Sequence, residues 1–220
     1  KTLAQLVKNC YFENRRRYGV RRIKASLNKE GVKIGKFQVR QLMKEGGLKA
    51  IGPKKFVPQT TDSKGTNASP NLLKEIKLEE CAIGKVVIGD ITYIPLQNGS
   101  WCYLAIWQDK VTRRIVGWSL AATMTAELVI SALQKAIRMG LIVAGAMIHS
   151  DRGSQYASND FRELLRTSGF RQSMSGKGNC YDNAQAESFF SRFKTELLEG
   201  GAFADLDEAR SEIFTYIEGY

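Results

Sequence analysis

Histidine, paired cysteines and long apolar runs are scarce in this chain, and each shortage excludes a class of protein. His149 is the only histidine and the four cysteines stand far apart, so a zinc site built from Cys and His is not expected. The scattered cysteines also give no disulfide framework, which favours a reducing cytoplasm. No apolar run approaches the roughly 18 residues that a membrane span needs, so we expect no membrane partner.

Acidic residues are scarce in one part of the chain only. The 220 residues carry a formal net charge of +11. Residues 1–58 hold 16 of the 33 Lys and Arg residues but only 3 of the 22 acids, so the remainder is nearly neutral. A basic block joined to a neutral one favours phosphate neutralisation, which makes nucleic acid the expected partner. Solvated, Lys-rich helix faces are the alternative.

Residues 1–50 are predicted to form short helices over 3–10, 20–29 and 36–45, because apolar residues recur there at helical spacing and glycines follow two of them. Short helices with basic residues around the last one favour a helix-turn-helix DNA-binding domain. A three-helix protein-binding module is the alternative. On the first interpretation the DNA-contacting residues are Arg21, Arg22, Lys36, Gln38, Arg40, Gln41 and Lys44.

Residues 51–70 contain three of the four prolines and many Ser, Thr and Asn, which is typical of a linker. We therefore predict a helix-turn-helix domain over 1–50, a linker over 51–80 and a second domain over 81–220. The chain lacks a starting Met and stops inside a helical pattern, which suggests a piece of a longer reading frame.

The second domain is predicted to alternate strands and helices. Strands are expected over 85–96, 101–108 and 113–121, with hairpin turn residues over 97–100. A helix over 126–139, a strand over 143–148, a helix over 159–168, a strand over 170–173 and a last helix from about residue 181 follow. This order predicts an α/β fold with a mixed five-stranded sheet, which ribonuclease H-like proteins share.

Three acids occupy distinctive places in these elements. Asp90 lies inside the apolar strand VVIGDITYI, and Asp151 ends the segment AMIHSD. Glu187 lies early in the last helix, for which Asp182 and Gln185 can form a capping box. An acid inside an apolar strand must be paired, protonated or bound to a cation, because a lone buried charge is very costly. For Asp90 alone, a salt bridge is the alternative.

A ligand set of carboxylates without His or Cys favours Mg²⁺ or Mn²⁺ as the bound metal ion. Three carboxylates drawn from two strands and a helix can hold two ions roughly 3.5–4 Å apart. Such a pair activates an attacking oxygen and stabilises a leaving one. The three positions together therefore predict metal-assisted phosphoryl transfer.

The segments GDITYI, YLAIWQD, RRIVGW, HSDRGSQY and YDNAQAESFFSRFKTE resemble the catalytic core of bacterial transposases of the insertion-sequence-three family, within the retroviral integrase superfamily. That superfamily carries a D,D-35-E triad, and 35 residues separate Asp151 from Glu187 here. YGVRRIKASLNKEGVKIGKFQVRQLMKEGGLKA also resembles the helix-turn-helix upstream of this core. Two positions depart from the pattern: Val87 stands where Trp is frequent, and Gly89 where Thr is common.

The resemblance implies roles for residues around the triad. Asp90, Asp151 and Glu187 would be the catalytic, metal-binding acids. Lys194, seven residues after the Glu and so on its face of a regular helix, would hold a phosphate; an exposed helix Lys is the alternative. His149 would support the Asp151 loop, and Phe189, Phe190 and Phe193 would be core. Weaker candidates for DNA contact are Asn183, Ser154 and Gln155.

The resemblance also implies the activity. The chain would be a DNA transposase that cleaves and joins strands at terminal inverted repeats and in target DNA. It would act as a dimer or larger homo-oligomer, in the bacterial cytoplasm at the nucleoid. The alternatives are a ribonuclease H-like nuclease or resolvase, and a truncated transposase that only binds DNA.

Overall fold

The computed structural model describes residues 2–51, 69–76, 81–176, 183–198 and 201–219. The chain divides into two compact units. Unit 1 comprises Lys1–Lys55 with Lys194–Glu199, and unit 2 comprises Phe56–Phe193 with Gly200–Tyr220. Among helices within the described ranges, none combines the length and apolar content that crossing a membrane requires.

Unit 1 contains three helices, α1 (Leu3–Glu13), α2 (Val20–Lys29) and α3 (Lys36–Glu45), which confirm the predicted helices with α1 slightly longer. The Thr2 side chain caps α1 by accepting from the Gln5 amide. One apolar side of each helix faces a shared core, which is why the basic residues remain outside. The buried core residues are Val7, Cys10, Tyr11, Ile23, Leu27, Ile34, Val39 and Met43.

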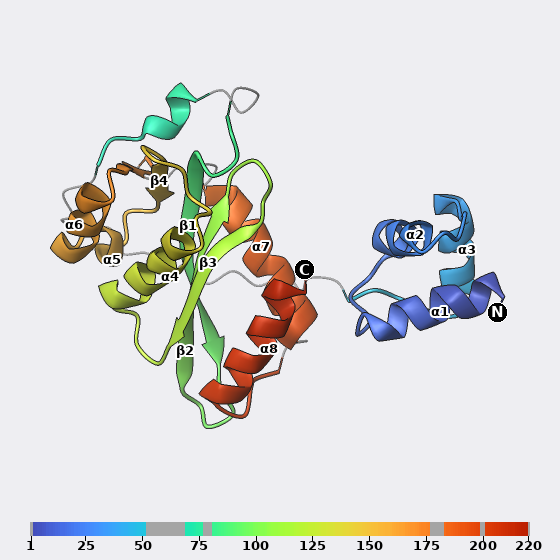
Figure 1. Ribbon diagram of the computed structural model, residues 1–220. Coiled ribbons are helices and arrows are strands. Elements are labelled where there is room, and N and C mark those ends of the chain that lie inside the picture. The colour runs from blue at the N-terminus through green and yellow to red at the C-terminus, as the bar shows by residue number, and fades with distance from the viewer. Residues whose placement is uncertain (1, 52–68, 77–80, 177–182, 199–200, 220) are drawn as a thin grey trace. The chain divides into compact units, whose positions relative to one another are not determined.

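Unit 2 is built on a mixed five-stranded sheet, which confirms the predicted sheet (Figure 1). Its order is β3-β2-β1-β4-β5, with antiparallel pairing among the first three strands and parallel pairing of β4 with β1 and β5. The predicted hairpin turn is present, since Asn98 Oδ1 accepts from the Ser100 amide and Gly99 has a φ of 81°. The strands are β1 (Val86–Pro95), β2 (Trp101–Asp109), β3 (Ile115–Ala121), β4 (Met147–Ser150) and β5 (Arg171–Met174).

Helices cover both faces of this sheet (Figure 1). On one side α4 (Ala126–Arg138), α5 (Ser154–Ala157) and α6 (Asn159–Thr167) enclose the main core around Trp107 and Phe161. On the other side α7 (Ala184–Phe193) packs against β1, and α8 (Leu206–Glu218) against β3. Phe189, Phe190 and Phe193 are buried, as predicted. Side chains alternate along a strand, so each β1 residue faces one helical layer only.

Gly89 on β1 faces the first layer, opposite Trp107 of β2. A Cβ on Gly89 would lie 2.6 Å from Cε3 of the Trp107 ring. This distance is shorter than the contacts that Cβ atoms make in real proteins. The indole is held there because its Nε1 donates to the Val129 carbonyl at 3.0 Å. Glycine therefore fits at this position because the Trp107 ring occupies the space of a side chain.

One predicted strand was misplaced. The strand predicted over 143–148 begins only at Met147, because Gly145 has a φ of 65° and turns the chain. The short helix α5 was not predicted. Residues 69–72, predicted to be linker, hydrogen-bond to the edge strand β5: Leu72 N donates to Ser173 Oγ at 2.9 Å, and Met174 N donates to the Pro70 carbonyl.

Candidate functional site

Asp90 and Asp151 come from adjacent parallel strands. In the pairing of β1 with β4, Val86 lies beside Met147 and Ile88 beside His149. The same register, continued two residues further, leads from Asp90 to Asp151, which directly follows β4. Neighbouring strands lie about 4.8 Å apart, so the two acids lie side by side at the end of β4.

Glu187 approaches Asp90 from the helix that covers the same face of the sheet. Asp90 alternates with Gly89, which lies opposite Trp107, and therefore faces away from Trp107, towards the side on which α7 packs against β1. Glu187 lies in the first turn of α7 and is exposed. Two strands and one helix thus supply the three acids, as the sequence predicted.

The three carboxyl groups influence one another electrostatically. The pKa of Asp90 is raised from 3.8 to about 8, first by burial, then by the negative charge of Asp151 and, to a smaller extent, by that of Glu187. The Ile91 amide and the Asn183 side chain oppose this rise by donating hydrogen bonds to the Asp90 carboxylate. Like charges held this close repel, and a cation bound among them would stabilise all three.

The oxygen atoms at this place fit a hard divalent cation. Asp151 Oδ1 accepts from the Gly153 amide at 2.9 Å, which fixes one carboxylate oxygen in a tight turn. Asn183 is buried, and its Oδ1 has no hydrogen-bond partner among the described residues. An orphaned buried oxygen beside three carboxylates matches the all-oxygen ligand sets of Mg²⁺ and Mn²⁺.

The side chains are not gathered into one coordination sphere. Within the described ranges, no group of three or more His, Cys, Asp or Glu side chains lies close enough together to hold a metal ion. The exposed Glu187 side chain is the member free to rotate towards the two aspartates. The capping partner predicted for α7, Asp182, lies outside the described residues.

His149 braces the Asp151 strand. It is fully buried, with Nδ1 2.8 Å from Ser173 Oγ and Nε2 3.2 Å from Ser175 Oγ. Arg152 adds a second link, since its Nε donates to the Ser175 carbonyl at 2.8 Å. The residues on both sides of Asp151 are therefore tied to β5 and the segment after it, which is the supporting place expected for His149.

Asp109, which the sequence did not single out, and Gln185 together position α7. Asp109 ends β2 as a buried carboxylate that accepts from the amides of Gly84, Val111 and Thr112 and from the Thr112 hydroxyl. Gln185, expected in a capping box, instead donates from Nε2 to the Asp109 carbonyl at 3.1 Å. The rigid turn at Asp109 therefore anchors α7 two residues before Glu187. Asp109 is the last residue of the segment YLAIWQD, and its place in that segment is the sequence signal that could have identified it.

Tyr156 was also missed. Its side chain is buried under Trp107 and Phe161, and its hydroxyl has no partner among the described residues. Burial and the charges of Asp151 and Asp90 raise its pKa well above 10. The hydroxyl therefore remains neutral beside the acids and is available as a hydrogen-bond donor.

The other predicted contact residues of unit 2 border the acids. Ser154 is exposed at the start of α5. Gln155 is half-buried, and its Nε2 donates to the Met124 carbonyl at 3.2 Å. Both follow the Asp151 turn by a few residues, so they lie at the rim of the site, with the Gln155 amide directed towards the segment before α4.

In unit 1 the predicted DNA-contacting residues divide into two groups. Lys36, Arg40 and Lys44 are exposed on α3, and Arg21 is exposed on α2. Arg22 is different, because its Nη1 donates to Glu196 Oε1 at 3.0 Å.

Lys194 also groups with unit 1, where it is half-buried and begins the π-helical segment Lys194–Leu198. The predicted shared face with Glu187 assumed a regular α-helix, which ends at Phe193. That Lys194 and Glu187 share a helix face therefore stays a prediction.

Family models match nearly the whole chain. Residues 82–180 match an integrase core domain, residues 168–220 match a second integrase core domain model, and residues 1–56 match an HTH-like domain. The boundary between the helical and the integrase matches falls between residues 56 and 82.

Curated relatives are similar to this chain over almost all of its length. The insertion element IS600 uncharacterized 31 kDa protein of Shigella sonnei is 39% identical over 212 residues, covering 96% of this chain and 77% of that protein. The transposase for insertion sequence element IS904 of Lactococcus lactis subsp. lactis (strain IL1403) is 39% identical over 219 residues, covering 99% and 85%. Transposase InsF for insertion sequence IS3A of Escherichia coli (strain K12) is 35% identical, covering 95% and 72%.

Among solved structures, a chain of the simian T-cell lymphotropic virus intasome in complex with PP2A regulatory subunit B56 gamma matches with a TM-score of 0.52 and 18% identity. The match covers 87% of this chain and 63% of that chain. At this identity the likeness shows the fold, and it agrees with the predicted integrase-type, ribonuclease H-like core.

Proposed function

Because the chain belongs to the IS3 family of insertion-sequence transposases, we propose that Asp90, Asp151 and Glu187 are its catalytic acids. The observation that carries this proposal is the convergence of the three carboxylates on one face of the sheet, where burial, and after it the charges of Asp151 and Glu187, raise the pKa of Asp90 to about 8. Placing carboxylates close together costs free energy because their charges repel. A bound cation compensates these charges, so such clusters are typical of cation sites.

The acids would hold Mg²⁺ or Mn²⁺, with two ions per site. When bound, such ions would activate the attacking oxygen and stabilise the leaving one in an in-line displacement at phosphorus. Asp90 and Asp151 hold fixed positions on neighbouring strands, while Glu187 closes the site from α7. Asn183 orients Asp90 by donating to its carboxylate, and its buried Oδ1 is placed to accept a hydrogen bond from a water or hydroxyl in the site.

The reaction would proceed by two displacements without a covalent protein intermediate. Water attacks a phosphodiester at the element end, the P–O bond to the 3′ oxygen breaks, and a free 3′-OH results. That 3′-OH then attacks a second phosphodiester, forms a new P–O bond and releases another 3′-OH. In line with the family, the first joining would connect the two ends, and the resulting circle would later insert elsewhere.

Unit 1 would bind the terminal inverted repeats. Lys36, Arg40 and Lys44 recur every four residues on α3 and are exposed, so they form one basic face on this helix. Two ends must be processed, so at least two copies would act on double-stranded DNA. The place of action would be the bacterial cytoplasm, where chromosomal DNA lies.

Product analysis tests this function. A labelled duplex carrying a terminal repeat is incubated with the transposase and Mg²⁺, and both shortened and joined strands are measured. The proposal predicts both products. Shortened strands alone, at every metal and DNA concentration, would identify a nuclease or resolvase, and binding without either product would identify a DNA binder.

Cation binding is expected to depend on pH. The folded pKa of Asp90 lies above the unfolded value of about 3.9, so the stability that its protonation confers is complete below about pH 4 and is lost as pH rises through about 8. A divalent cation must displace this proton, so its stabilising effect should grow from about pH 6 to about pH 8. Thermal unfolding with Mg²⁺ or with a chelator measures both trends.

The Asp90→Asn variant should lose both trends, because it carries no titrating group at that position. An identical response to Mg²⁺ at about pH 6 and about pH 8 in the parent chain would contradict the coupling of proton and cation.

Gln185→Ala is expected to reduce strand transfer by between about tenfold and a hundredfold, because α7 loses its bond to the Asp109 carbonyl and Glu187 is misplaced. The free energy of unfolding should fall by only about 1 kcal/mol, the value of one hydrogen bond. Gln134→Ala on the exposed side of α4 is the control. Equal activity of the two variants would show that the bond does not position Glu187.

A further inference from the structure

An aromatic side chain stands exposed on a helix of unit 1. Phe37 is the second residue of α3, and 77% of it is exposed, the largest exposed fraction among the described large apolar residues. It lies outside the core of unit 1, to which α3 contributes Val39 and Met43. Single apolar residues at a surface are ordinary, so the surroundings of Phe37 decide what its exposure means.

Phe37 shares one face of α3 with Gln41. The two residues are four positions apart, so they lie one above the other on the helix, on the side opposite its buried residues. Both are exposed. The basic face formed by Lys36, Arg40 and Lys44 borders them, so a phenyl ring and an amide stand beside a row of cations.

The Gln41 side chain is oriented by its neighbour on the helix. Its Nε2 donates to Glu45 Oε1 at 2.9 Å. A primary amide has two N–H donors and an acceptor oxygen, so one donor and the oxygen are left without a partner among the described residues. Adenine presents an acceptor, N7, beside a donor, the N6 amino group, in the major groove. This pair matches the two groups that Gln41 retains.

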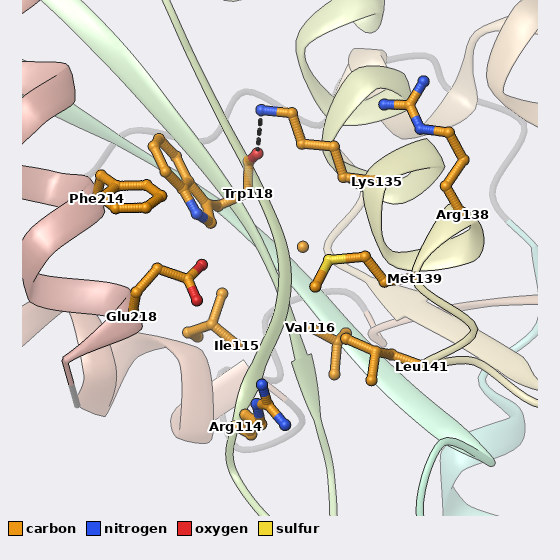
Figure 2. Close-up of a pocket in the computed structure, with 11 residues that line it drawn as sticks. Arg114, Ile115, Val116, Trp118, Lys135, Arg138, Met139, Leu141, Phe214 and Glu218 are labelled. Atoms are coloured by element: carbon orange, nitrogen blue, oxygen red, sulfur yellow. Dashed lines mark hydrogen bonds between the residues drawn. The ribbon is translucent and has the colours of Figure 1, made fainter.

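The exposed apolar side chains of unit 2 have a different setting. Phe214 and Met139 line a cavity of about 320 Å³ beside β3 (Figure 2). Charges of both signs line this cavity, since Arg138 and Glu218 both contribute to it. In contrast, the charged residues within four positions of Phe37 are all basic. A polyanion is therefore the partner that fits the exposed face of α3.

We propose that Phe37 and Gln41 recognise A·T base pairs of the terminal repeat from the major groove. This groove is about 12 Å wide and admits an α-helix, and the second helix of a helix-turn-helix contacts base edges with its N-terminal residues. The Phe37 ring packs against the 5-methyl group of thymine, and the Gln41 amide bonds to N7 and N6 of adenine in a neighbouring pair. Lys36, Arg40 and Lys44 contact the phosphates, which carry no sequence information.

This inference rests on the proposed DNA-binding role of unit 1 and is independent of the three acids, since α3 contains none of them. Binding is therefore measured without Mg²⁺, and a chain with an inactive triad should recognise the same sequence. If the chain bound no duplex at all, the DNA-binding role of unit 1 would fail together with the inference. If it bound duplexes but ignored the groups named here, the inference alone would fail.

Base analogues that remove one group from the major groove test the two contacts. The full chain selects a duplex from a pool with a randomised centre, and this duplex is resynthesised with uracil for thymine or with 7-deazaadenine for adenine. Uracil lacks the 5-methyl group, and 7-deazaadenine lacks the N7 acceptor. Each analogue should weaken binding by the parent chain by between about threefold and tenfold, as expected for the loss of one methyl contact or one hydrogen bond.

Three variants assign each loss to one side chain. Phe37→Ala should bind the thymine and uracil duplexes equally, while it still discriminates against 7-deazaadenine. Gln41→Ala should show the reverse. Lys36→Ala should weaken binding to every duplex by the same factor and should reduce the dependence of affinity on salt, as the loss of a phosphate contact does.

Phe12→Ala is the matched control. Phe12 is also an exposed phenylalanine of unit 1, at 53%, but it lies on α1. This variant should keep both discriminations of the parent chain. Circular dichroism verifies that each variant is folded, which is expected for Phe37→Ala because Phe37 lies outside the core.

The inference is overturned if the selected sequence lacks A·T pairs, or if Phe37→Ala distinguishes thymine from uracil as strongly as the parent chain does. It is also overturned if Phe37→Ala leaves DNA binding unchanged but lowers the mass in sedimentation equilibrium, since the ring would then contact another protein chain. Loss of the thymine preference in Phe37→Ala, with Phe12→Ala unchanged, supports it.

Discussion

An Asp151→Asn variant is expected to lose Mg²⁺-dependent strand transfer by at least about a thousandfold while it remains folded. Removing one carboxylate charge weakens the grip on the cations that stabilise the transition state, and a thousandfold corresponds to about 4 kcal/mol. The fold should persist, because an Asn side-chain oxygen can still accept from the Gly153 amide. Stability should not fall, because the charge that raises the pKa of Asp90 is removed.

The measurement is the rate of joined-product formation, with the melting temperature taken on the same preparation. Asp160→Asn is the matched control, since Asp160 is an exposed acid in the first turn of α6. It should retain the parent rate. If Asp151→Asn joined strands as fast as the control, Asp151 would be no ligand and the site would have to lie elsewhere.

Gly117→Ala should destabilise unit 2 more than any surface change. A Cβ at Gly117 on β3 would collide with the Ala132 carbonyl oxygen of α4 and lie 3.0 Å from Ala136 Cβ. Because the nearest atom belongs to helix backbone, no side-chain rotation relieves the collision and α4 must move away from the sheet. We expect a loss of about 3 kcal/mol, or roughly 10 °C in melting temperature.

Gly35→Ala is the control for this prediction. Gly35 has a φ of −86°, and no other atom lies within 4 Å of the place that its Cβ would take, so a methyl group fits there. Its change in stability should be within about 0.5 kcal/mol. Equal melting temperatures of the Gly117→Ala variant and the parent would show that α4 and β3 are not packed as closely as described.

Most elements of the fold were predictable from local sequence. The apolar alternation of β1 and β2 and the Asn98-Gly99 turn between them specify a hairpin whatever surrounds it. The helices of unit 1 follow in the same way from apolar spacing. The strand β4 was misplaced, because an apolar run does not reveal which of its residues pair until Gly145 is seen to turn the chain.

The proposed acids were singled out from their spacing, but the contact that anchors α7 was not. The Asp109 carbonyl that holds Gln185 is 76 residues away in sequence, so no local pattern connects them. The same is true of Gly89, whose small size is explained only by the Trp107 ring across the β1–β2 ladder. The roles of these residues depend on neighbours that are distant in sequence, and the sequence alone does not show which residues become neighbours.

The charge coupling of the site also required the fold. From the sequence, Asp90 could have been a salt-bridged residue. The structure instead surrounds it with two further acids and raises its pKa, which is the opposite of what a basic partner does. This arrangement favours the proposed cation site over a structural ion pair.

Titration of the chain with Mn²⁺, followed by the electron paramagnetic resonance signal of the free ion, tests the shared cation site most directly. The parent chain should bind close to two ions, and Asp90→Asn, Asp151→Asn and Glu187→Gln should each remove binding, whereas Asp160→Asn should not. Unchanged Mn²⁺ binding by all three variants would contradict the assignment of these carboxylates as ligands.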